Sequence, residues 1–117
     1  MAVSHVADKA GTRRAVAAKK SAKDTAGRSK QAQRASILLK QVSDPTRLQL
    51  VMLLTEREMH VGGLSEQLSQ SQPAVSHHLA LLRHGGLIAP RRQGKNNYYA
   101  LTETGEYLAG VVKGIMA

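Results

Sequence analysis

The chain has 117 residues, enough for one domain and a tail, and its 17 Lys and Arg outnumber its 8 Asp and Glu. The resulting net charge of +9 favours a polyanionic partner, either nucleic acid or an anionic membrane surface. The absence of cysteine excludes disulfides, thiolate metal sites and thiol redox switching. No apolar run approaches the roughly 18 residues of a membrane span, so we expect a soluble, cytoplasmic protein without a membrane partner.

Residues 1–34 form a basic tail. They hold nine Lys and Arg against two Asp, a net charge of +7, whereas the other 83 residues carry a net of +2. With few large aliphatic side chains, the tail is expected to be disordered or transiently helical. We expect it to bind phosphates without reading sequence. A purely solubilising extension or an organelle transit peptide is the alternative reading of this composition.

A folded domain is expected over residues 35–117. An apolar cluster at Ile37–Val42 predicts a helix that stops before Asp44, which then caps a second helix with Pro45 in its first turn. The second helix is apolar on most sides, as expected of a buried core helix. A loop at Glu56–His60 and a short third helix, roughly Val61 to Leu68, follow.

The fourth helix is expected to begin after Ser71, a good N-cap, and to end at the glycine pair Gly85-Gly86. At about 100° per residue, its apolar residues fall on one face together with His78, which we expect to be a half-buried, hydrogen-bonded structural residue. The opposite face is polar. It carries Pro73, Ser76, His77, Ala80 and His84.

A basic hairpin is expected next, with arms at Leu87–Gln93 and Asn97–Leu101 and Gly94 at its tip. Arg91 and Arg92 point to opposite faces of a strand, so only one of them is expected to face a DNA backbone. Of Tyr98 and Tyr99, one should pack inside and the other lie outward, and alternation alone does not say which.

Thr102 is expected to cap a last helix that has an apolar stripe and nothing downstream to cover it. Pairing with a second copy would cover the stripe together with the first helix of the domain. The predicted fold is mainly α with a small β-hairpin, an α+β homodimer. The predicted dimer interface comprises Ile37, Leu38, Leu108, Val111, Val112 and Ile115.

Several blocks in this order resemble the ArsR/SmtB family of bacterial winged helix-turn-helix repressors. They are SDPTRL at 43–48, SQPAVSHHL at 71–79, GLI at 86–88, and Gly94 followed by YYAL at 98–101. The resemblance covers residues 35–117. It implies a winged helix-turn-helix homodimer that binds a palindromic operator and represses transcription.

The DNA-binding residues then fall in two groups. Gln can pair with the adenine edge, and Ser and His are flexible readers. The resemblance places the first half of the fourth helix in the major groove, and the basic hairpin on the phosphates. The predicted contacts are Ser71, Gln72, Pro73, Ser76 and His77 in the helix and Arg91, Arg92 and Lys95 in the hairpin.

The family's usual ligands are missing from this chain. The cysteine motif of the third helix is replaced by His60-Val61-Gly62-Gly63-Leu64, and the last helix has neither histidine nor aspartate. We therefore predict no cofactor and no standard metal site, and the effector is unknown. A weak alternative keeps His60 as a zinc or nickel ligand, completed by His5 and Asp8 from the tail.

The leading functional hypothesis is a sequence-specific transcriptional repressor. The alternative is a nucleoid-type protein of low sequence specificity, driven by its basic tail. An enzyme is not expected, because no nucleophile, base and acid share a plausible pocket and no glycine loop could cradle a phosphate.

Overall fold

The computed structural model describes residues 22–117, and by internal contacts the chain divides into two units, Met1–Ala35 and Ser36–Ala117. The described helices are α2 (Ala22–Gln41), α3 (Pro45–Glu56), α4 (Val61–Leu68), α5 (Gln72–His84) and α6 (Glu103–Met116), and the strands are β1 (Met59–His60), β2 (Ile88–Gln93) and β3 (Asn96–Leu101). Predictions that concern residues 1–21, including those for His5 and Asp8, lie outside the described residues.

Helix α2 begins well before the expected start of the domain at residue 35. Composition predicts a disordered or transiently helical tail over residues 22–34, and the structure places them in one continuous helix with the apolar residues that follow. Alanine-rich sequence has high helix propensity, and the helix needs no new nucleation because it continues from residues 36–41. No residue of α2 is buried, so propensity and not packing extends it.

Three helix starts follow the predicted caps. The side-chain oxygens of Asp44, Ser71 and Thr102 accept hydrogen bonds from the backbone N–H groups of Arg47, Ala74 and Gly105. Each bond satisfies one of the free donors at a helix N-terminus. Local sequence therefore determines where α3, α5 and α6 begin.

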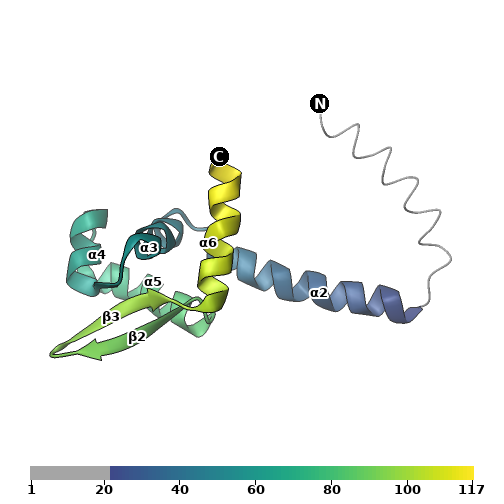
Figure 1. The fold of residues 1–117 in the computed structure, drawn as a ribbon, viewed down its shortest axis with the longest axis horizontal. Helices are drawn as coiled ribbons and strands as arrows, with labels where there is room; N and C mark the ends of the chain where they lie inside the picture. Colours follow the sequence, from purple (N-terminus) through teal and green to yellow (C-terminus); the bar gives the residue numbers. More distant parts are fainter. Residues whose placement is uncertain (1–21) are drawn as a thin grey trace. The chain divides into compact units, whose positions relative to one another are not determined.

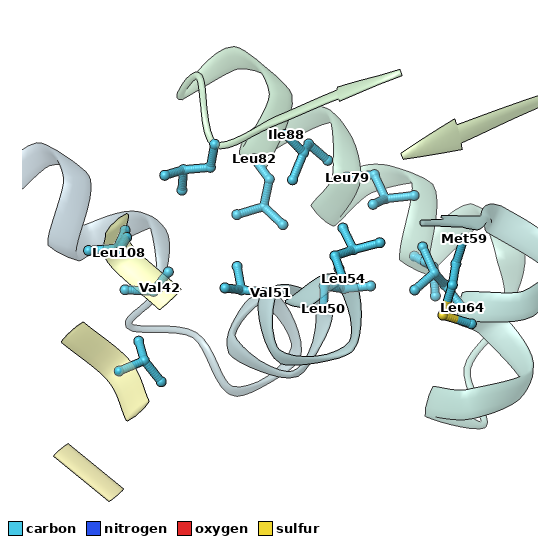
Figure 2. Close-up of a cluster of buried hydrophobic side chains, with 13 residues drawn as sticks. Val42, Leu50, Val51, Leu54, Met59, Leu64, Leu79, Leu82, Ile88 and Leu108 are labelled. Atoms are coloured by element: carbon cyan, nitrogen blue, oxygen red, sulfur yellow. The ribbon is translucent and has the colours of Figure 1, made fainter. Parts of the chain in front are cut away.

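The core lies where α3 meets the other elements of the domain. Leu50 and Val51 of α3 are no more than 1% exposed, and Figure 2 shows them among side chains from α5, β2 and α6. Leu82 of α5 and Ile88 of β2 are equally enclosed. This confirms the prediction that the second helix of the domain is a buried core helix.

The sheet has three antiparallel strands in the order β1-β3-β2, one more than the predicted hairpin. Residues Met59 and His60, expected in a loop, pair with Tyr99 and Tyr98 of β3. The expectation was wrong because a two-residue strand has no periodicity of its own and forms only where its partner lies. Beyond this pairing, β2 and β3 continue as a two-stranded hairpin that extends away from the helices (Figure 1).

Candidate nucleic-acid interface

Helix α5 packs against the core through its apolar face, and its polar face is exposed to solvent. Val75, Leu79 and Leu82 are buried in the core. Gln72, Pro73, Ser76, His77 and Ala80 are all exposed. The division into faces is the predicted one, so the residues expected to read DNA lie together on the free side of the helix.

The turn between α4 and α5 contains a residue in a left-handed conformation and a hydrogen bond to α3. Ser69 ends α4 in a left-handed conformation, with φ of 54° and ψ of 43°. Serine is mildly strained in this conformation, which glycine adopts more readily. Gln70 then binds Thr46 of α3 through its amide, with Nε2 at 3.2 Å from Oγ1. This hydrogen bond joins the turn of the helix-turn-helix to the core helix α3.

His78 has the structural role expected of it. Its side chain is 21% exposed, and Nδ1 lies 3.4 Å from Nη1 of Arg47 and 3.8 Å from Oδ2 of Asp44. A neutral ring can accept from the guanidinium, and a protonated ring can pair with the carboxylate. In either form His78 connects α5 to the start of α3.

Arg47 was not singled out among the functional residues, although it belongs to the SDPTRL block. Its Nε donates to the carbonyl of Gln41 at 2.7 Å, so one side chain joins the end of α2 to α3 and α5. The pKa of Asp44 is lowered from its ordinary value of 3.8, mainly because its carboxylate accepts a hydrogen bond from the backbone N–H of Arg47. The positive charges of His78 and Arg47 lower it further. A charged Asp44 is therefore part of this junction at neutral pH.

The two arginines of the hairpin differ in what they contact. Arg91 donates from Nε to Oε1 of Glu58 at 2.9 Å, and its guanidinium lies 6.0 Å from the centre of the Tyr98 ring. Arg92 donates to the carbonyl of Gly94 and is exposed, as is Lys95. Arg92 and Lys95 are the cations of the hairpin tip that are free of an acidic partner within the described residues.

His60 lies between the helix-turn-helix and the hairpin. Its Nδ1 accepts from the backbone N–H of Gly63 at 2.9 Å and so caps α4, and its ring stacks on Tyr98 with ring centres 5.3 Å apart. A Cβ at Gly62 or Gly63 would approach this ring to 3.3 Å, so the glycine pair leaves room for the histidine. Tyr98 is therefore the tyrosine that faces His60 and Arg91, whereas Tyr99 packs against the core.

Of the three residues in the zinc or nickel hypothesis, only His60 lies within residues 22–117. The Nδ1 lone pair of His60 is already used by the cap, which leaves Nε2 for a metal. Within residues 22–117, no cluster of three or more His, Cys, Asp or Glu side chains could hold a metal ion. The hypothesis therefore depends on His5 and Asp8, which lie outside the described residues.

The predicted dimer residues divide between core and surface. Leu108 and Val112 are about 5% exposed and pack inside the protomer, whereas Ile37 and Ile115 are 60% and 76% exposed. An apolar groove of about 310 Å³ separates the end of α2 from α6. It is lined by Leu39, Val42, Ser43, Leu48, Leu108, Val111, Val112, Ile115 and Met116. None of the helices in the described part of the chain is long and apolar enough to cross a bilayer.

Known proteins share this sequence and fold. Residues 44–89 match the family described as "Bacterial regulatory protein, arsR family". The transcriptional activator HlyU of Vibrio cholerae is 40% identical over 75 residues, which cover 64% of this chain and 69% of that protein.

Solved structures extend the match. The crystal structure of the transcriptional repressor BigR from Xylella fastidiosa has a TM-score of 0.68 and 35% identity, and the alignment covers 84% of this chain and 98% of that one. A homodimeric winged helix-turn-helix DNA-binding domain of Mycobacterium bovis, Mb0332, has a TM-score of 0.67 at 25% identity, over 85% of this chain and 89% of that one. The chain is a winged helix-turn-helix, DNA-binding transcription regulator that belongs to the ArsR/SmtB family.

Proposed function

We propose that this regulator is a homodimeric repressor that binds a palindromic operator in the cytoplasm and is not an enzyme. The observation that carries the proposal is the exposed polar surface of α5, which includes Gln72, Ser76 and His77 in the first half of the helix. Such side chains can read base edges in a major groove. The tip of the β2–β3 hairpin supplies Arg92 and Lys95 for the phosphates beside it.

The dimer is supported by the exposed apolar side chains of α2 and α6. Ile37, Ile115 and Met116 are each at least 60% exposed, and Ile115 and Met116 line the apolar groove together with Leu39 of α2. A second copy of the same surface would cover it, and a two-fold dimer would place two α5 helices about one DNA turn apart. The winged helix-turn-helix domain of Mb0332 is homodimeric, which is consistent with this arrangement.

A competition footprint with the full chain tests the repressor. DNA upstream of its own gene should contain a protected palindrome, and random duplex should compete about a thousandfold less well at physiological salt. The triple variant Gln72→Ala, Ser76→Ala and His77→Ala should lose this preference and keep its non-specific binding. Equal competition by random DNA would instead indicate the nucleoid-type alternative, which no described feature favours.

The effector is a separate question. Because the chain has no cysteine, we propose that thiol oxidants and thiolate-seeking metals do not control it. Titration with zinc and nickel tests the remaining metal hypothesis at His60. Unchanged operator affinity would eliminate that site, whereas an effect lost in His60→Ala would establish it.

A further inference from the structure

The N-terminal part of α2, residues 22–35, is an exposed helix. All residues from Ala22 to Ala35 are exposed, and none belongs to the hydrophobic core. The helix therefore holds its side chains in a fixed pattern around its axis without burying any of them. The charged side chains are unevenly distributed around this axis.

Three of its basic residues share one face. At about 100° and 1.5 Å per residue, Lys23, Lys30 and Arg34 fall within an arc of about 40° and extend about 16 Å along the axis. We call these three residues the α2 stripe. Gly27 lies on the same face between them, and nothing comes within 4 Å of a Cβ built there. The stripe is thus a row of cations with an open gap in its middle.

The other charges of α2 lie elsewhere around the helix. Arg28 and Lys40 project about 100° or more from the middle of the stripe, and Asp24 lies about 100° from Lys23. The stripe is consequently a directional surface and not a uniformly charged rod. It can face a polyanion along its length while the remaining charges stay in solvent.

We propose that the α2 stripe binds the phosphate backbone of duplex DNA. The inference rests on the proposed function, since it needs a chain that is already held on DNA. Duplex DNA carries one charge per roughly 1.7 Å of axis, so about 16 Å of it contains around ten phosphate charges on its two strands, more than the three cations of the stripe require. An anionic membrane fits less well, because a helix lying on a membrane needs an apolar face. Residues 22–35 contain no apolar side chain larger than alanine.

A pair of variants with equal charge and composition tests the direction of the surface. Lys30→Gln with Arg34→Gln removes one Lys and one Arg from the stripe, and Arg28→Gln with Lys40→Gln removes one of each from elsewhere on α2. Both are made in the full chain, and circular dichroism verifies that helix content is kept. Fluorescence anisotropy then measures affinity for a 40-base-pair random duplex between 50 and 200 mM NaCl.

Removal of four stripe charges from a dimer should reduce the slope of log affinity against log salt by about 3 to 4. The control pair should change the slope by less than about 1. Equal slopes for the two double variants would overturn the stripe and leave only diffuse attraction. Tighter binding to anionic vesicles than to the duplex would overturn DNA as its partner. A failure of the proposed repressor function would look different. No operator would be preferred over random DNA, whereas the salt slopes of the two double variants would still differ.

Discussion

Gly105→Ala should test how closely α6 must approach Leu87, which lies between α5 and β2. Gly105 is buried in the first turn of α6, and a Cβ there would overlap the backbone carbonyl of Leu87. That carbonyl also accepts from the N–H of Thr102 at 3.0 Å, and the Thr102 hydroxyl donates to the carbonyl of Gly86 at 2.6 Å. The junction between α5 and β2 is thus held to α6 at this point.

The loss of stability in Gly105→Ala depends on how far the backbone at Leu87 must move to make room for the added methyl group. Overpacking usually costs about 1–3 kcal/mol, and here the obstacle is backbone, which has no alternative rotamer. Alanine regains up to about 1 kcal/mol of helix propensity, less near a helix end. We expect a net loss of about 2 kcal/mol, which would lower the melting temperature by roughly 8–16 °C.

Thermal unfolding by circular dichroism, at equal protein concentrations, measures this effect. Gly110→Ala is the matched control, because it lies in the same helix and has nothing within 4 Å of an added Cβ. It should be neutral or stabilising by up to about 1 kcal/mol. If Gly105→Ala were as stable as Gly110→Ala, the close approach of α6 to Leu87 would not be required by the fold.

Three further predictions follow from single contacts. His60→Ala should cost about 1 kcal/mol in urea unfolding because it removes the cap of α4, and His60→Asn should recover most of that loss; equal losses would exclude the capping role. Because the pKa of Asp44 is lowered in the folded state, the stability it adds is complete above its ordinary pKa of 3.8 and is lost as pH falls through the lowered value. The stability difference between wild type and Asp44→Asn should therefore shrink below about pH 4, and a difference constant from pH 6 to pH 2.5 would contradict this. Arg92→Gln with Lys95→Gln should reduce the salt slope of DNA binding more per charge than Arg91→Gln, since Arg91 already pairs with Glu58; similar slopes per charge would remove the distinction.

The helix starts were predictable because a cap is a local device. Asp44, Ser71 and Thr102 each bond to a backbone N–H three residues ahead, so the signal and its effect lie in the same short segment. The amphipathic pattern of α5 is local in the same sense. Its periodicity alone separates the buried Val75 and Leu79 from the exposed residues on the opposite face.

Pairings between distant segments were not predictable in this way. Strand β1 exists because Tyr98 and Tyr99 lie opposite it, about 40 residues later in the chain. The same pairing brings the His60 ring onto Tyr98 and so decides which tyrosine lies outward. Arg91 finds Glu58 across the sheet for the same reason, and this contact separates its role from that of Arg92.

Beyond the winged helix-turn-helix fold, which the family resemblance implied, the sequence by itself determined a basic, cysteine-free chain, the ends of most helices and the polar face of α5. These follow from charge, composition, capping and periodicity, which act within a few residues. Only the tertiary structure decided that the His60 ring stacks on Tyr98, that Arg47 joins three helices, and that Gly105 must lack a side chain. Each of these depends on a contact between segments that are distant in the sequence and come together only on folding, so no local sequence pattern predicts it.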